Sequence, residues 1–223
     1  MKFRLNQRSI LLAALLAASV PALQGCFPVV AGGVAVGVLA AVDRRTVGTQ
    51  TEDETIEWKA SSRISDKYGN AHVNVTSYNR HVLLTGEAAS EEAKAEIGEL
   101  ARTVDNVVGV WNEIRVAPNS SLGDRSRDSY ITSKVKARFV DANQFPANHI
   151  KVVTEASTVF LMGLVTEREA KAGIQVARTT DGVRKVVNVT EVISDAEAQR
   201  LDRNAGKNQS SAKPSEAAPV ESR

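Results

Sequence analysis

Cysteine is almost absent from this sequence of 223 residues, which holds a single one, Cys26. A chain with one cysteine has no internal disulfide to form. Aromatic residues are also scarce, at 4% of the sequence, so any core must be built mainly from Val, Ile, Leu and Ala. The protein therefore depends on small aliphatic cores rather than on covalent cross-links.

Motifs of catalysis are missing as well. The sequence has no Gly-x-Ser-x-Gly elbow, no phosphate-binding loop and no dinucleotide fingerprint. His72, His81 and His149 have no carboxylate or cysteine at metal-ligand spacing, which favours surface or turn histidines. We therefore expect no enzymatic activity, no catalytic residues, no bound metal and no cofactor apart from a covalent lipid.

A strong excess of one charge is missing too. The formal net charge is +2, and three of the cations lie in the first 25 residues, so the chain without that segment carries −1. A nucleic-acid-binding protein needs a pronounced cationic excess. Nucleic acid is therefore excluded as an expected partner.

Residues 1–25 have the plan of an export signal, in which cations precede a short apolar run. The run ends in the tetrapeptide LQGC, which resembles the lipobox of bacterial lipoproteins. That resemblance implies cleavage before Cys26 and attachment of three acyl chains, which together anchor a protein stably. Phe27 stands where aspartate would signal retention at the inner membrane, so the resemblance implies the periplasmic face of the outer membrane. The alternative is that Cys26 is an ordinary buried or stray thiol.

Residues 26–45 carry an apolar, glycine-rich stretch, from Phe27 to Val42. It is shorter than the roughly 20 residues of a membrane-spanning helix, and its glycines weaken helix formation. The pattern predicts a flexible tether, with a glycine-mediated packing surface as the alternative.

An internal repeat dominates the rest of the sequence. Residues 83–97 read LLTGEAASEEAKAEI and residues 160–174 read FLMGLVTEREAKAGI, with identical residues at seven of the fifteen positions. Self-similarity at a fixed spacing indicates repeated structural units. The chain is therefore predicted to hold two small domains of the same fold.

Each copy has the periodicities of one helix, two strands, a second helix and a last strand. Apolar residues recur at four-residue spacing in the first helix of each copy, as at Ile131, Val135 and Phe139. The fold class predicted is α+β, with two tandem αββαβ units, each a mixed three-stranded sheet covered on one face by two helices. The predicted boundaries are domain 1 at 46–116, a linker at 117–127, domain 2 at 128–193 and a disordered tail at 194–223.

Local signals support these elements. Gly86 and Gly163 near the ends of equivalent strands predict a bulge or a close backbone approach. Thr166 and Glu169 predict a capping box at the second helix of domain 2. Trp58, on another face of the first helix, is expected to pack between the domains or at the core edge.

The repeat resembles the BON domain, which has a VxLxG strand end, a following helix and a closing V..V.N strand. The matching residues are Val82, Leu84, Gly86, Val107, Val110, Asn112, Val159, Leu161, Gly163, Val183, Val186 and Asn188. With the lipobox and the tether, residues 1 to about 193 are similar to dual-BON outer-membrane lipoproteins associated with division and outer-membrane stress.

That resemblance implies binding of anionic, phosphatidylglycerol-like phospholipid through the first helix of domain 2. The implied site is Tyr130, Ile131, Lys134 and Arg138. Tyrosine can sit at headgroup depth, and a nearby Lys or Arg contributes about 1 kcal/mol of attraction to an anionic surface. The alternative for this helix edge is an ordinary solvated flank.

The function implied is a periplasm-facing, lipid-anchored outer-membrane protein that binds anionic phospholipid and supports cell-envelope integrity, with a role at division sites. The rival is an adaptor for envelope-assembly, division or peptidoglycan-remodelling proteins, in which lipid contact is incidental. The sequence leaves open the lipid specificity, the oligomeric state, the orientation of the two domains and the role of the tail.

Overall fold

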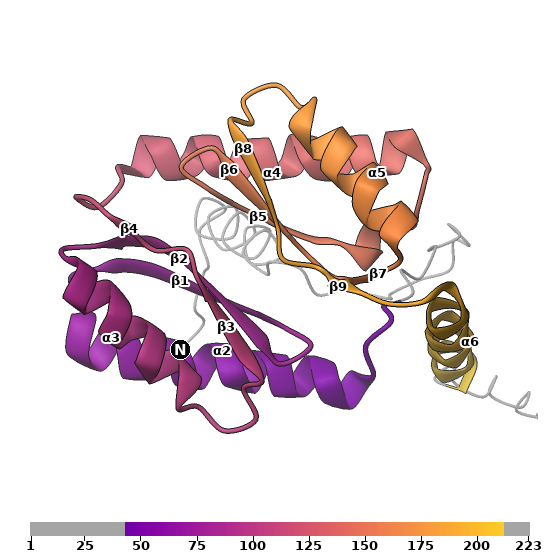
Figure 1. Cartoon of the computed structure of the whole chain (residues 1–223), viewed down its shortest axis with the longest axis horizontal. Helices are drawn as coiled ribbons and strands as arrows, with labels where there is room; N and C mark the ends of the chain where they lie inside the picture. The colour runs from indigo at the N-terminus through magenta and orange to yellow at the C-terminus, as the bar shows by residue number, and fades with distance from the viewer. Residues whose placement is uncertain (1–42, 212–223) are drawn as a thin grey trace, which may run out of the picture. The chain divides into compact units, whose positions relative to one another are not determined.

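Residues 43–211 are described here by a computed structural model. The predicted signal peptide, Cys26 and the tether up to residue 42 lie outside them. The described residues contain two αββαβ domains that follow one another in the chain, as the repeat predicts (Figure 1).

Domain 1 begins with its longest helix. Its elements are α2 (Val47–Tyr68), β1 (His72–Tyr78), β2 (His81–Ala88), α3 (Glu91–Arg102), β3 (Gly109–Asn112) and β4 (Arg115–Val116). The strand order is β1-β2-β3, with β1 antiparallel and β3 parallel to β2, and β4 pairs with the end of β2. The predicted mixed sheet is confirmed.

Domain 2 repeats this order. Its elements are α4 (Leu122–Ala142), a 3-10 turn η2 (Ala147–His149), β5 (Lys151–Glu155), β6 (Thr158–Met162), β7 (Leu164–Val165), α5 (Glu167–Arg178), β8 (Lys185–Asn188) and β9 (Glu191–Val192). Ser121 caps α4 by accepting the Asp124 amide proton, so the helix starts inside the linker predicted at 117–127. The linker prediction was too long at its C-terminal end.

Each sheet buries one face under its own two helices. The stripes predicted on the first helices are buried, with Ile56, Ala60 and Ile64 in domain 1 and Ile131, Val135 and Phe139 in domain 2. These stripes pack on alternate residues of the central strands, such as Val82 and Leu84 in β2.

The second face of each sheet packs against the other domain. Leu83 from β2 joins Phe160 and Met162 from β6 in a third core, to which Tyr78 and Val189 also belong. The strands lie between α2 and α3 on one side and α4 and α5 on the other (Figure 1). The central strands β2 and β6 are therefore buried on both faces.

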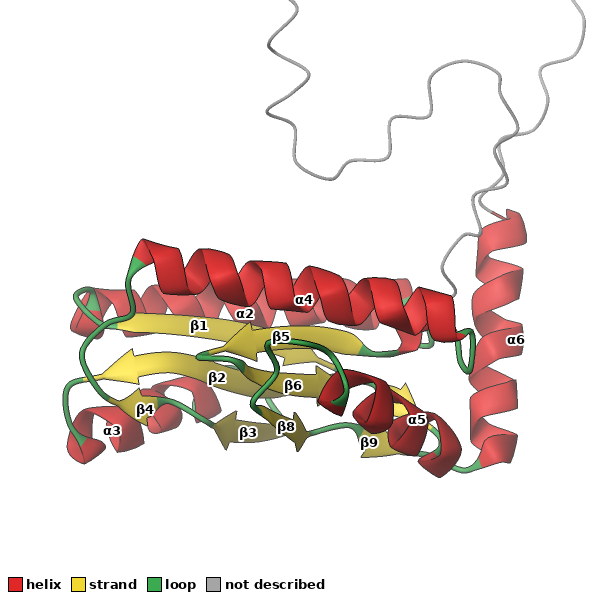
Figure 2. Ribbon diagram, turned by 90° about the horizontal axis from the view of Figure 1, so that it is seen from above, coloured by secondary structure: helices red, strands yellow, loops and turns green. Residues whose placement is uncertain are grey.

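The chain continues in a helix where a disordered tail was predicted. Helix α6 (Asp195–Ser211) stands at the β7–β9 end of domain 2 (Figure 2). Ala198 is buried, and Leu201 packs against the core between the sheets. The prediction for 194–223 was wrong over this helix because two apolar contacts and one ion pair suffice to hold a mostly polar segment.

The glycines at the strand ends do what the sequence predicts. A Cβ at Gly86, whose φ is 107°, would lie 2.0 Å from the His72 carbonyl oxygen, and one at Gly163 would lie 2.3 Å from that of His149. Both positions thus require glycine because a backbone passes too close for any side chain.

A buried aspartate in each first helix holds the hairpin turn of its domain. Asp53 accepts hydrogen bonds from the amides of Asn79 and Arg80, and Asp128 accepts from the amides of Ala156 and Ser157. All four turn residues have positive φ. These carboxylates stabilise a left-handed turn without glycine, a device that the sequence analysis missed.

Candidate functional site

Helix α4 carries the residues that the sequence analysis assigns to lipid binding. Tyr130 is 64% exposed, and the Lys134 Nζ lies 4.9 Å from the centre of its ring. The same ammonium group is 2.9 Å from an oxygen of Asp181, whose side chain is 98% exposed. Lys134 lowers the pKa of Asp181 through a hydrogen bond and through its charge. Tyr130, which is exposed, and Lys134, whose side chain is 25% exposed, thus lie side by side on one edge of the helix.

Arg138 is already engaged inside the domain. Its guanidinium donates to the carbonyl of Val176 and to the hydroxyl of Thr180, at the C-terminal end of α5. Domain 1 has the same arrangement, since Arg63 donates to Thr103 and Lys59 pairs with Asp105. Arg138 therefore holds two helices together, a task that both domains share.

Ile131 lies in the core of domain 2 and is only 2% exposed. Its side chain does not reach the surface, so the prediction that it contacts lipid was wrong. The four-residue spacing from Ile131 to Val135 had already placed it on the buried stripe. Its role is to fix the rotation of α4, which turns Tyr130 outward.

The outer face of α4 offers further apolar and cationic groups. Leu122, Tyr130 and Val140 are among the exposed large hydrophobic residues, at 64–80% exposure, and Lys136 is also exposed. The helix holds five cationic and three acidic residues, and one of the acids is the buried Asp128. Leu122, Lys136 and Val140 were not among the predicted site residues, because outward-facing positions of a helix follow no apolar pattern of their own.

Helix α2 of domain 1 has the opposite balance, with three cationic and five acidic residues. Its Trp58 is 71% exposed, which corrects the expectation that this ring packs between the domains or at the core edge. The two first helices therefore share a fold and a core stripe but present different surfaces.

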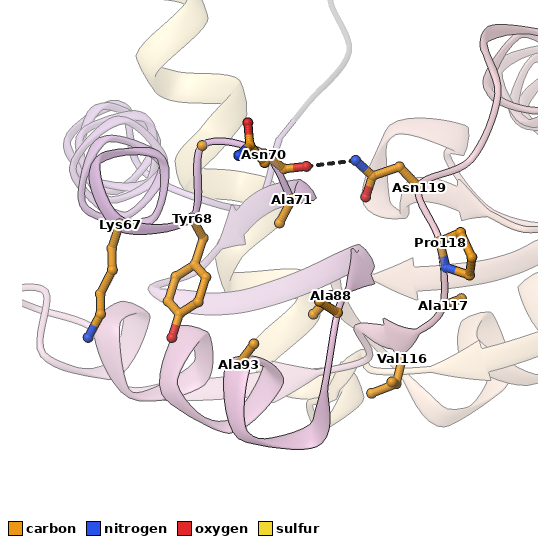
Figure 3. A pocket seen from close by; sticks show the side chains of 12 residues that line it. Lys67, Tyr68, Asn70, Ala71, Ala88, Ala93, Val116, Ala117, Pro118 and Asn119 are labelled. Carbon is orange, nitrogen blue, oxygen red and sulfur yellow. Dashed lines mark hydrogen bonds between the residues drawn. The ribbon is translucent and has the colours of Figure 1, made fainter.

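A cavity of about 820 Å³ opens at the end of domain 1 (Figure 3). Methyl groups of Ala71, Ala88 and Ala93 line it, with Tyr68 and Pro118 beside them. In domain 2 the chain between α4 and His149 is longer than the chain between α2 and His72 in domain 1, and it carries Phe145, which packs edge-on against Phe139 in the core. Gly173 makes room for the neighbouring Ile150, since a Cβ there would lie 2.6 Å from the Ile150 Cδ1 atom.

Arg44, just before α2, is buried in domain 2 rather than in domain 1. Its guanidinium donates to both oxygens of Glu169, at 2.7 and 3.1 Å, to the Leu164 carbonyl and to both oxygens of Asp202 in α6. Glu169 also completes the predicted capping box with Thr166. This cluster joins the start of the fold, α5 and α6.

Electrostatics of this cluster follow from its contacts. Burial would raise the pKa of Glu169, but His149, Arg44 and the Thr166 amide outweigh it and hold the pKa well below the usual range. His149 Nδ1 is 3.5 Å from Glu169, too far for a strong hydrogen bond, so we assign most of the effect to Arg44. His149 lies in a turn as expected, but it is buried rather than on the surface.

His72 lies beside two carboxylates that are far from it in sequence. Its Nδ1 is 2.9 Å from an oxygen of Glu87, and one ligand atom each of His72, Glu87 and Glu155 lie within 4.8 Å of one another. These three residues are far apart in the sequence and come together only when the two domains pack, so ligand spacing along the chain gives no signal for the cluster.

Among residues 43–211, no helix is both long enough and apolar enough to cross a membrane.

Comparison with known proteins bears on both halves of the chain. The BON domain family matches residues 52–118 and 127–194. An outer membrane lipoprotein, DolP of Haemophilus influenzae, is 39% identical over 170 residues, which are 75% of this chain and 88% of that protein. The 21 kDa hemolysin of Actinobacillus pleuropneumoniae is 35% identical over 68% of this chain and 80% of its own length. The osmotically-inducible protein Y of Escherichia coli is 26% identical over 64% of this chain and 73% of its own length.

Proposed function

The chain belongs to the BON-domain family, as a dual-BON lipoprotein of the DolP family, and from this premise we propose that it binds anionic phospholipid through α4. Like its relative it is a lipid-anchored protein of the outer membrane, and it acts in the cell envelope. In the proposal, Cys26 provides the anchor and domain 2 provides a second, composition-sensitive contact. No catalytic step is assigned to it.

The exposed face of α4 carries the proposal. It places the Tyr130 ring, 64% exposed, next to the Lys134 ammonium group, with Val140 and Lys136 further along the helix. An aromatic ring that is apolar at its body and polar at its tip suits the headgroup region, and cations attract an anionic surface. Leu122 would add apolar contact at the start of the helix.

Lys134 is available to a phosphate group because its present partner is weakly bound. Asp181 is almost fully exposed, and ion pairs between exposed groups contribute little. A lipid phosphate can replace this carboxylate without opening the core. Arg138, in contrast, would have to leave Val176 and Thr180, so we assign it to positioning the helix.

Two membrane signals act together in this proposal. The acylated Cys26 keeps the protein at the bilayer, and α4 shifts its distribution towards regions rich in anionic lipid. The contact is charge-steered and therefore weakens as salt is raised. Enrichment in such regions, division sites among them, is how the protein would support envelope integrity.

The test is vesicle flotation with the chain from residue 43 onward, which lacks the apolar segment and Cys26 but keeps Arg44 and α6. We expect binding to vesicles that contain phosphatidylglycerol and little binding to vesicles of neutral lipid alone. Lys134→Glu should weaken binding by about 2 kcal/mol, roughly 30-fold, because it replaces one attraction with one repulsion. Tyr130→Ala should weaken it as well.

Domain 1 offers the matched control. Lys59 pairs with Asp105 as Lys134 pairs with Asp181, so Lys59→Glu breaks an equivalent ion pair on an acidic helix. Binding that is unchanged in Lys59→Glu and lost in Lys134→Glu supports the proposal. Equal losses in both variants would show that α4 is not the lipid site.

A second function, that of an adaptor for envelope proteins, draws support from Trp58. A ring that is 71% exposed on a helix surface is typical of protein interfaces. A larger cellular defect from Trp58→Ala than from Lys134→Glu would favour this function over lipid binding.

A further inference from the structure

The junction between the two domains holds an imidazole and a carboxylate that share one neutral donor. The side-chain amide nitrogen of Asn74 is 2.9 Å from Glu155 Oε2 and 3.4 Å from His72 Nε2. His72 and Asn74 lie two residues apart in β1, so both side chains project from the same face of the strand. Glu155 ends β5 of the other domain and is 6% exposed.

Glu87 fixes the orientation of the imidazole. It lies directly across from His72 in the β1–β2 pairing, it is 0% exposed, and its Oε2 is 2.9 Å from His72 Nδ1. A proton on Nδ1 that is donated to this carboxylate leaves the lone pair on Nε2, on the side of Asn74. A carboxylate behind a histidine is the usual support of a metal-binding imidazole.

Charge at the junction is unbalanced in favour of a cation. The carboxyl groups of Glu87 and Glu155 are both buried here, and Asp128 lines the same cavity as Glu155. The nearby Arg125 donates to Ser120 instead, and Arg115, half exposed, reaches Glu87 only at 3.5 Å.

Solvent can reach the same atoms. A polar cavity of about 340 Å³ is lined by His72, Asn74 and Glu155, and its lining also includes the carboxylate of Asp128 and the guanidinium of Arg125. It is wide enough for an ion to enter with bound water, and water can complete a coordination shell that the protein leaves open.

We propose that His72 Nε2 and Glu155 bind a divalent transition-metal ion of the zinc type, with Asn74 as a third ligand and Glu87 as the support of the imidazole. Rotation of the Asn74 amide brings its oxygen to the place of its nitrogen, so that a cation replaces the shared N–H donor. Imidazole and carboxylate ligands suit Zn²⁺, whereas Mg²⁺ prefers oxygen ligands alone.

The site is specific to the junction and is not a feature of the repeat. In domain 2, Lys151 stands at the position of Asn74 and Leu164 at that of Glu87, while His149 faces Glu169 and Arg44. A bound ion would take ligands from both domains and would fix their relative placement. It should therefore stabilise the folded chain by an amount that grows with the concentration of free ion.

The test is calorimetric titration of the full chain, purified in detergent, with ZnSO₄ and separately with MgSO₄. We expect one Zn²⁺ per chain, no binding of Mg²⁺, and a higher thermal unfolding midpoint with Zn²⁺. His72→Gln and Glu155→Gln should each weaken Zn²⁺ binding at least about tenfold. His81→Gln, which removes an imidazole that is stacked on Trp111, faces Glu191 and is not part of the His72 cluster, is the matched control and should bind as the unchanged chain does.

A gain-of-binding variant guards against loss through misfolding. Asn74→Asp replaces the shared amide by a carboxylate, so we expect tighter Zn²⁺ binding and a larger Zn²⁺-dependent rise in the unfolding midpoint. The proposal would be overturned if the unchanged chain failed to bind one Zn²⁺. It would also be overturned if His72→Gln or Glu155→Gln bound Zn²⁺ as tightly as the unchanged chain, or if Asn74→Asp bound it no more tightly.

Discussion

Domain 1 and domain 2 have the same fold but differ in the packing of their cores and in the surfaces of their first helices. Domain 1 leaves an open cavity lined by alanines, and its first helix is acidic. Domain 2 adds Phe145 to its core, and its first helix is cationic, with an exposed tyrosine. After duplication, the buried stripe and the turn-holding aspartate kept their roles, while the outward positions changed. The proposed lipid contact lies on the domain whose own core is closed.

The largest difference in stability should come from the aspartates that hold the two hairpin turns. Asp53 accepts hydrogen bonds from the Ser77 hydroxyl and two turn amides and pairs with Arg45, whereas Asp128 accepts from the two amides of its own turn. We expect Asp53→Ala to lower the free energy of unfolding by about 4 kcal/mol, since it leaves two turn amides and the Ser77 hydroxyl without their acceptor and removes one of the two carboxylate partners of Arg45. Asp128→Ala should cost about half as much. Urea denaturation measures both, and equal costs would contradict this assignment.

Phe145→Ala tests whether a filled core distinguishes domain 2. Removing a buried ring from the cluster around Phe139 should cost about 3 kcal/mol and open a cavity like that of domain 1. The measurement is chemical denaturation, with Tyr68→Ala as the domain 1 counterpart. Because Tyr68 is only partly buried beside an existing cavity, its loss should cost less. A larger cost for Tyr68→Ala would reverse the comparison.

Glu169 and Glu92, which occupy equivalent positions in the two domains, should show the smallest difference in stability. It is also the most specific difference, because it depends on pH. Glu169 is buried against Arg44, while Glu92 is exposed. Because the folded-state pKa of Glu169 is depressed, its contribution is complete above the ordinary value of 4.5 and is lost as the pH falls towards the folded-state pKa. Glu169→Gln should cost about 2 kcal/mol at neutral pH and less in acid.

The control for this contrast is Glu92→Gln, which should leave the unfolding midpoint nearly unchanged at pH 7. Thermal unfolding of both variants between pH 7 and pH 3 measures the difference. A Glu169→Gln chain that retains the acid sensitivity of the unchanged chain would show that another carboxyl group is responsible.

Much of the fold could be predicted because each domain repeats a local pattern. The stripe of Ile131, Val135 and Phe139 and the close approach at Gly163 both follow from spacing alone. The packing of the two sheets against each other could also have been predicted, because the apolar run in β6, Thr158–Met162, leaves the strand no polar face for solvent.

The site could be predicted only in part. The proximity of Tyr130 and Lys134 follows from their four-residue spacing on one helix, while their contact with lipid stays a prediction. The contacts of Arg44 and His72 were not predicted, since their partners are brought to them by the packing of the domains, over separations of 125 and 83 residues. Spacing along the chain carries no signal for such contacts. The three residues of α4 that were missed lie at outward positions, where no periodic pattern singles them out.

The Arg44 cluster also determines where tension applied along the N-terminal segment first acts on the fold. Residues before Asp43 lead to the predicted anchor, so tension along the chain would enter at Arg44, beside α5 and α6, before it reached α2. The guanidinium is held by two carboxylates and one carbonyl group at that point. Tension would therefore act first on domain 2. The ion pairs of Arg44 with Glu169 and Asp202 would have to break before the force reached α2.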